Sequence, residues 1–384
     1  MRRTPKENIN QSFINLIRKA HGLIENSDIE KHRHSQDQMG ALFGNSREVA
    51  VTETTVGSMY AEWIRVDRPH SGKKIILYCH GGGYSTGSPL YARTLTTKLA
   101  SQLSMDVFCF DYRLAPEHPY PAAVDDAQAA WDYLMLQGYG AKDIFVAGDS
   151  AGGNLALALG LRLKKQKRML PAGFVLMSPW TDLTVSGKTH ETKADVDPVL
   201  NQNYLNEMIE NYVPQAKKVQ MEAVKPLQEA GTLQEGNTIQ AASTLREANA
   251  LQEGNIIRAA DTLQEGNILQ AANTLQTAGT EKQKPGDKSA NKVFEEIFDT
   301  EYLRNPEISP LFGDFTGFPP TYIQVGDLEV LMSDSTMLQK KMSGEGVAVS
   351  LDTYKNMWHV FQMGPFKTAV EAIHKCGEFI YSVQ

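Results

Sequence analysis

One serine stands where a strand is expected to meet a helix, with a glycine two residues away on each side. Residues 148–152 read Gly-Asp-Ser-Ala-Gly, so Ser150 is the centre of a G-x-S-x-G pattern. The apolar run at 143–147 predicts a buried strand directly before this pattern, and the run at 151–167 predicts a helix directly after it. A serine on such a tight turn projects its hydroxyl above the sheet. The pattern therefore predicts nucleophilic catalysis by Ser150, with an ordinary helix-capping serine as the alternative.

A glycine-rich loop is the second feature that could do chemistry. His80, Gly81, Gly82 and Gly83 directly follow the apolar run at 74–79. Consecutive glycines let backbone N–H groups approach a ligand without obstruction from a Cβ atom. Together with the N–H after Ser150, such donors can stabilise an oxyanion. A phosphate-binding loop is the alternative, but the Lys-Ser or Lys-Thr pair that it needs does not follow the glycines.

A histidine later in the chain is the expected general base. After a nucleophile on a turn of this kind, the usual chain order is acid and then histidine, which leaves His190, His359 and His374 among the nine histidines. His190 precedes any suitable acid, and His374 lies in a helical run. His359 follows the strand-like residues 347–354, where a loop can carry the imidazole over the nucleophile. We therefore predict that His359 is the base.

The acid that orients this histidine should follow the apolar run at 321–326. Asp327, Glu329 and Asp334 all lie within reach of that strand end. A carboxylate there would hold the imidazole in the required orientation and stabilise its charged form. The residue types alone do not choose among the three.

Short apolar runs alternate with helical intervals from residue 73 onward. Their continuous hydrophobicity indicates burial on both faces, which is typical of a parallel sheet covered by helices. Residues 48–56 and 58–66 predict an antiparallel ribbon at the edge of that sheet. In the first 40 residues, apolar side chains at helical spacing predict a helix that covers the site as a lid or packs in the core. The predicted strands are 74–79, 107–112, 143–148, 173–178 and 321–326, and the predicted helices are 121–136, 151–167 and 333–342.

Residues 227–280 repeat a six-residue unit that always begins with Leu or Ile, as in LQEGNT and LQAANT. Six residues advance a helix by about 600°, which scatters the aliphatic side chains instead of aligning them in one stripe. Low hydrophobicity with recurring Gly, Asn and Gln favours weak order, and packed β-coils or a loose helix are the alternatives. No catalytic residue type recurs there consistently, so we expect the chemistry to lie elsewhere.

Composition excludes several classes of function. The chain has 384 residues, a formal net charge of -7 and a pI near 5.8, which give no general attraction to nucleic acid or anionic lipid. The basic cluster at 162–168 is interpreted as the solvated end of a helix. No membrane span or signal peptide is expected. The three cysteines match no zinc site or disulfide framework, so we expect a reduced cytoplasmic protein.

Six motifs, in order along the chain, resemble the hormone-sensitive-lipase branch of the α/β-hydrolases, a family that includes small bacterial carboxylesterases. The resemblance covers residues 72–214 and 299–384. It implies an α/β-hydrolase fold with an N-terminal helical cap at 1–45, a core in two parts at 46–214 and 299–384, and a repeat insertion at 215–298. The motifs are HGGGY at 80–84, DYRLAPEHPYPAA at 111–123, GDSAGGNLA at 148–156, SPWTDLT at 178–184, SPLF at 309–312 and WHVFQ at 358–362.

The resemblance also implies roles for individual residues. It implies that the oxyanion donors are the N–H groups of Gly82, Gly83 and Ala151. Glu329-Val330-Leu331 stands where commoner relatives have Asp-Pro-Leu, as in the sub-branch similar to heroin esterases. Glu329 is therefore the implied acid, and Asp327 stays the alternative. Finally, Arg113 and Glu117 are implied to brace the turn that carries the nucleophile.

The implied activity is that of a serine carboxylesterase. Its substrates would be short-chain acyl esters or small lactones, cleaved through an acyl-enzyme intermediate without a metal or organic cofactor. An amidase or N-deacetylase with the same triad, and a ligand-binding protein without catalysis, are the alternatives. The expected partner is a small-molecule ester, and the sequence leaves the oligomeric state open. Tyr84, Trp180 and Trp358 are either walls of the pocket or plain core aromatics.

Overall fold

The computed structural model describes residues 28–44, 46, 48–68, 73–218 and 294–383, together with Ile14, Arg18 and Lys19. These residues belong to one compact unit, formed by Met1–Lys218 and Ser289–Gln384. A second unit, Val219–Lys288, contains the hexapeptide repeats and lies outside the described residues. Most of the helical pattern expected before residue 28 also lies outside them, so the proposed lid stays a prediction.

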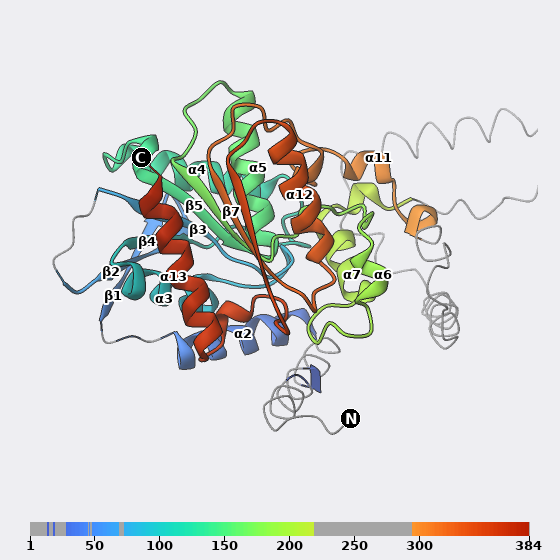
Figure 1. Cartoon of the computed structure of the whole chain (residues 1–384), viewed down its shortest axis with the longest axis horizontal. Helices are drawn as coiled ribbons and strands as arrows, with labels where there is room; N and C mark the ends of the chain where they lie inside the picture. Colours follow the sequence, from blue (N-terminus) through green and yellow to red (C-terminus); the bar gives the residue numbers. More distant parts are fainter. Residues whose placement is uncertain are drawn as a thin grey trace, which may run out of the picture. The chain divides into compact units, whose positions relative to one another are not determined.

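An eight-stranded sheet with the order β1-β2-β4-β3-β5-β6-β7-β8 forms the centre of the described unit (Figure 1). The expected edge ribbon is present, because β1 (Val49–Val56) pairs antiparallel with β2 (Met59–Val66). β2 in turn runs antiparallel to β4 (Asp106–Phe110). The other pairs are parallel and join β3 (Ile75–Cys79), β4, β5 (Ile144–Asp149), β6 (Gly173–Met177), β7 (Thr321–Gly326) and β8 (Val349–Tyr354).

Helices cover both faces of this sheet, which explains why its central strands are mostly apolar. On one face, α3 (Pro89–Leu103) and α13 (Lys367–Ser382) share a buried cluster with Tyr78 and Val107. On the other face, α4 (Ala122–Leu136), α5 (Ala151–Lys165) and α12 (Met332–Gly344) share a cluster with Leu77 and Phe108. The remaining described helices are α2 Ile29–Phe43, α6 Thr189–Thr192, α7 Gln202–Tyr212 and α11 Thr300–Leu303, with short 3-10 turns at Ala141–Asp143, Pro214–Ala216, Pro310–Phe312 and Phe361–Met363.

The basic cluster at the end of α5 is not simply solvated, contrary to the interpretation from charge alone. The Arg162 guanidinium pairs with Asp125 of α4 at 2.5 Å and with Glu307 at 2.6 Å, and its side chain is only 12% exposed. Arg168 pairs with Asp132, also from α4. The cluster therefore joins α5 to α4 and to the segment before the 3-10 turn Pro310–Phe312, a role that depends on partners distant in sequence.

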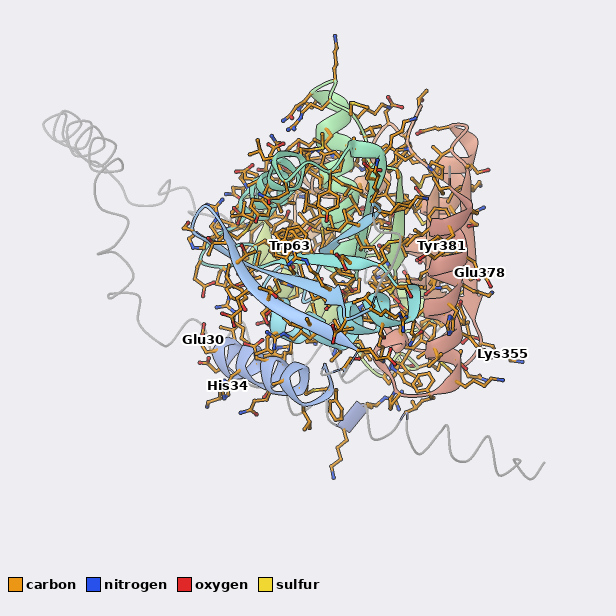
Figure 2. The ribbon with its side chains drawn as sticks, turned by 90° about the vertical axis from the view of Figure 1, so that its left-hand side faces the viewer. Glu30, His34, Trp63, Lys355, Glu378 and Tyr381 are labelled. Carbon is orange, nitrogen blue, oxygen red and sulfur yellow. The ribbon has the colours of Figure 1, made fainter. Side chains whose placement is uncertain are left out.

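Helix α2 lies at the surface of the unit and packs against the start of α3. A Cβ atom on Gly40 would overlap the backbone of Leu90, so the two helices approach closely there. Glu30 and His34 lie on the outward side of α2, while Trp63 is buried among the side chains of the interior (Figure 2). Among the residues that the structure describes, no helix has the length and apolar character needed to cross a membrane.

The two ends of the expected insertion lie side by side. The backbone N–H of Lys218 donates to the carbonyl of Ile297 at 2.8 Å, and the N–H of Asp299 donates to the carbonyl of Ala216 at 2.7 Å. Lys217 and Phe298 form an antiparallel bridge. The chain therefore leaves and re-enters the unit at neighbouring points, as an insertion into a surface loop requires.

We expect the repeat block to be dispensable for folding and for chemistry. The closely spaced ends allow a short Gly-Ser linker to replace residues 227–280, because the entropy of loop closure changes only logarithmically with loop length. The melting temperature should change by only a few degrees. Turnover of a small acetyl ester should stay within roughly tenfold, about 1.4 kcal/mol in barrier. A shortened chain that fails to fold, or that folds but loses acetyl-ester turnover, would show that the repeats form a packed structural or functional element.

Candidate active site

Ser150 occupies the sharp turn between β5 and α5. Its backbone has φ 54° and ψ −122°, outside the helical and extended regions, and its N–H donates to the carbonyl of Met177 at 2.9 Å. A Cβ on Gly148 would overlap the backbone of Gly152, and a Cβ on Gly152 would overlap the carbonyl of Cys79. The two glycines of the motif are therefore needed because the turn packs against itself and against the end of β3.

Two hydrogen bonds connect Ser150 to a histidine and a carboxylate. His359 Nε2 lies 2.9 Å from Ser150 Oγ, and His359 Nδ1 lies 3.0 Å from Glu329 Oε2. Glu329 follows β7, and His359 lies in the loop after β8, so the three side chains meet at the carboxyl edge of the parallel strands. The structure thus brings together the three residues expected from the sequence.

The environment favours the charged form of this imidazole. Burial acts to lower the pKa of His359, but the hydrogen bond and negative charge of Glu329, together with the charges of Asp197 and Asp149, raise the pKa above its usual value. Glu329 is fully buried, and its other oxygen accepts the Ser178 hydroxyl at 2.8 Å and the Gly326 N–H at 2.5 Å. Both carboxylate oxygens therefore have partners, which holds Glu329 in one orientation.

The other two candidate acids lie elsewhere. Asp327 accepts the N–H of Asn356 at 2.6 Å, and the N–H of its neighbour Leu328 donates to the carbonyl of Met357 at 3.1 Å. Asp334 is fully buried and lies 3.0 Å from His190 Nε2, forming a separate histidine–carboxylate pair. Neither carboxylate has a hydrogen bond to His359 among the described residues, so the geometry favours Glu329.

The expected oxyanion donors lie beside the nucleophile turn. Gly82 and Gly83 have φ of 118° and 61°, in the region that favours glycine. The loop is tied to the turn by Asp149, whose Oδ1 accepts the Gly81 N–H at 3.0 Å and the Tyr78 hydroxyl at 2.6 Å. Ala151 begins α5, where the helix N-terminus directs unpaired N–H groups outward. This arrangement can bind a negatively charged oxygen above Ser150.

Two residues that sequence reasoning missed hold the histidine loop. The Ser178 hydroxyl accepts the N–H of Val360 at 3.2 Å while it donates to Glu329, so it joins the acid to the residue after His359. The Lys98 ammonium donates to the carbonyls of Gln362, Met363 and Gly364 at 3.0, 2.6 and 2.9 Å. Burial lowers the pKa of Lys98 to about 8. The SPW motif contains Ser178, but no local signal distinguishes Lys98.

Arg113 and Glu117 do not brace the nucleophile turn directly, so this implication of the resemblance needs correction. Arg113 pairs with Asp126 of α4 at 2.8 Å. Glu117 pairs with Arg33 of α2, also at 2.8 Å, and the hydrogen bond from Arg33 lowers the pKa of Glu117 to about 2. Arg33 also donates to the Ser85 carbonyl at 2.9 Å, so it connects α2 to the glycine-rich loop.

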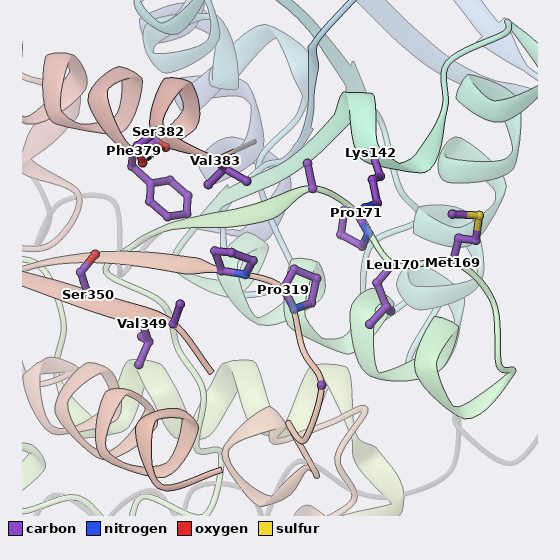
Figure 3. A pocket seen from close by; sticks show the side chains of 14 residues that line it. Lys142, Met169, Leu170, Pro171, Pro319, Val349, Ser350, Phe379, Ser382 and Val383 are labelled. Carbon is purple, nitrogen blue, oxygen red and sulfur yellow. Dashed lines mark hydrogen bonds between the residues drawn. The ribbon is translucent and has the colours of Figure 1, made fainter. Parts of the chain in front are cut away.

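A groove of about 930 Å³ lies at the amino-terminal ends of the parallel strands, opposite the ends that carry the candidate site (Figure 3). Its lining includes Pro171 before β6, Pro319 before β7 and Val349 at the start of β8. These positions are at the amino ends of the strands, whereas Ser150, Glu329 and His359 follow carboxyl ends. The groove is therefore separate from the candidate site.

Comparison with known proteins identifies the family. Residues 76–245 and 236–363 match a family described as having the alpha/beta hydrolase fold. An esterase from Acinetobacter venetianus is 30% identical over 349 residues, covering 90% of this chain and 87% of the relative. A crystal structure of a hormone-sensitive lipase from a metagenome library is 30% identical, with a TM-score of 0.69 and 97% coverage of each chain. The chain belongs to the hormone-sensitive-lipase-like branch of the α/β-hydrolases.

The expected fold and family resemblance are thus confirmed for this α/β-hydrolase. An acetyl-hydrolase from Streptomyces hygroscopicus is also similar, with 29% identity over 336 residues that cover 88% of this chain and 83% of the relative. Relatives that match over nearly their whole length are named as esterases or acetyl-hydrolases. This α/β-hydrolase is a carboxylic-ester hydrolase.

Proposed function

We propose that this α/β-hydrolase cleaves short-chain acyl esters or small lactones through an acyl-enzyme intermediate on Ser150. In the proposed reaction His359 Nε2 accepts the proton of the Ser150 hydroxyl as Oγ attacks the ester carbonyl. The N–H groups of Gly82, Gly83 and Ala151 stabilise the oxyanion, and Glu329 stabilises the imidazolium. His359 then protonates the leaving alcohol, and water, activated by the same histidine, releases the acid.

The observation that carries the proposal is the continuous chain of hydrogen bonds from Ser150 to His359 and from His359 to Glu329, at 2.9 and 3.0 Å. Serine is activated when its hydroxyl forms a hydrogen bond with a base and a third group orients that base. The raised pKa of His359 also suits a base that must carry a proton between the two halves of the reaction.

The proposal of a short acyl group is supported by α7, which packs next to the glycine-rich loop. Met208 of α7 is buried, and its side chain lies so close to Gly83 that a Cβ there would meet it. Tyr84 stacks on Tyr212 of the same helix with ring centroids 3.7 Å apart. These contacts place α7 directly against the loop that carries the proposed oxyanion donors, and they accord with the acetyl-hydrolase name of one relative.

A panel of esters from acetyl to decanoyl, with small lactones and matched anilides, tests the substrate class. We expect kcat/KM to be highest for acetyl to butyryl esters and to fall at least tenfold by decanoyl, about 1.4 kcal/mol or more in barrier. Anilides of equal acyl length should be turned over far more slowly than the esters. An anilide rate that matches the ester rate would identify an amidase or N-deacetylase instead, and a decanoyl optimum would contradict the short-chain proposal.

A further inference from the structure

We propose that Asp197, in the segment between α6 and α7, is a positioning residue that acts on His359 through its charge and on Glu329 through the backbone of Val330. The inference rests on the proposed function, because it concerns how the candidate acid and base are held. Asp197 is 6% exposed and was not among the residues that the sequence motifs indicated.

Three backbone N–H groups bind the Asp197 carboxylate. Oδ1 accepts from Val199 at 2.8 Å and from Leu200 at 3.1 Å, which closes a local turn. Oδ2 accepts from Val330 at 2.8 Å, a contact between residues 133 positions apart. An asparagine could keep the local turn, but its NH₂ group could not accept the third N–H. The site therefore needs a carboxylate, rather than a polar side chain of similar size.

Val330 directly follows Glu329, and residues between β6 and α7 form hydrogen bonds to both its N–H and its carbonyl. Asp197 binds its N–H, while the Thr189 hydroxyl donates to its carbonyl at 2.5 Å. The segment between β6 and α7 thus fixes, through two hydrogen bonds, the backbone next to the candidate acid. Displacing this backbone would move the Glu329 carboxylate away from His359 Nδ1.

Asp197 also adds negative charge near the imidazole. The charged groups that act on His359 are Glu329, Asp197 and Asp149, and each of them favours the imidazolium. Conversely, burial raises the pKa of Asp197 to about 6, while the charge of His359 lowers it and that of Glu329 raises it. Near neutral pH the Asp197 side chain is therefore an anion that stabilises the charged form of His359 as the reaction proceeds.

Asp197→Asn in the full-length protein tests this role through the pH dependence of kcat/KM. Removing the anion should lower the pKa of His359, so the acid limb should move to lower pH by on the order of half a pH unit. We also expect kcat to fall roughly tenfold with little change in KM, because imidazolium is less stabilised in the transition state. Asp197→Ser, which leaves room for a water molecule beside Val330, should shift the acid limb in the same direction.

Thr189→Val is the matched control. It loosens the next peptide group, at the carbonyl of Val330, without changing any charge, so it should reduce kcat modestly and leave the acid limb in place. If both Asp197 variants keep the wild-type acid limb, the residue is only a structural brace and the inference is wrong. An equal shift in Thr189→Val would also overturn it, since loosened backbone and not lost charge would then explain the effect.

The rate at which an organophosphonate labels Ser150, followed against pH, gives a second readout that depends only on folded molecules. It should show the same shift of the acid limb even where an Asp197 variant is partly unfolded. An unchanged limb in this labelling rate contradicts the role of Asp197 while leaving the proposed function intact. Labelling of a different serine in the wild-type protein would instead defeat the proposed function.

Discussion

Replacing Ser150 with alanine is expected to lower ester hydrolysis by roughly four to six orders of magnitude. The hydroxyl lies 2.9 Å from His359 Nε2 and is the group that we expect to be acylated. The fold should survive, because alanine removes a single oxygen and the backbone turn is maintained by Gly148 and Gly152. Initial rates with an acetyl ester measure the loss, and circular dichroism checks the fold.

Ser343→Ala provides the matched control, because Ser343 is exposed near the end of α12 and should have no effect on rate. Intact-mass analysis after treatment with an organophosphonate should show one adduct in the wild-type protein and none in Ser150→Ala. Peptide mapping should place that adduct on Ser150. A Ser150→Ala protein that still turns over the ester would contradict the assignment of Ser150 as the nucleophile.

The second large effect is expected from Glu329→Gln, with a loss of activity on the order of 10⁴, as for the acid of a serine-protease triad. A glutamine has only one acceptor oxygen, whereas Glu329 accepts from the Gly326 N–H, the Ser178 hydroxyl and His359. The amide would leave His359 in the wrong tautomer or orientation. Because the charge of Glu329 raises the pKa of His359, the acid limb of kcat/KM should also move to lower pH.

Asp327→Asn is the companion variant, and its activity should stay within about threefold of wild type, the range of a surface substitution. Its Oδ1 accepts only the N–H of Asn356 in the described structure, and an asparagine oxygen can make the same bond. The comparison decides between the two acids left open by the sequence. A greater loss from Asp327→Asn than from Glu329→Gln would mean that Glu329 is merely a neighbour.

The turn that carries Ser150 between β5 and α5 was predictable from the sequence because its signal is local. Gly148, Ser150 and Gly152 lie within five residues, and the strand and helix that flank them leave continuous apolar and periodic patterns. The central strands were predictable for a similar reason, since burial on both faces requires nearly every residue to be apolar. Predicted and observed bounds differ by a residue or two at strand ends, where side chains no longer report burial.

The choice of the acid was less accessible to the sequence. Asp327 and Glu329 are both carboxylates just after β7, and only the path of the chain decides which one faces the loop after β8. Similarly, His190 and His359 each pair with a buried carboxylate at 3.0 Å, but His359 alone has a serine hydroxyl on its other side among the described residues. Position along the chain suggested this outcome, whereas the distances come from the tertiary structure.

Only the tertiary structure revealed the residues that hold the site in place. Asp197, Ser178 and Lys98 act on backbone groups that are far away in the sequence, and a side chain that binds a distant carbonyl or N–H leaves no periodic pattern. The sequence therefore indicated the candidate residues for the reactive groups and the elements on which they lie. The structure decided which of them meet, because hydrogen-bond geometry depends on how separate elements pack, and packing joins residues without regard to their spacing along the chain.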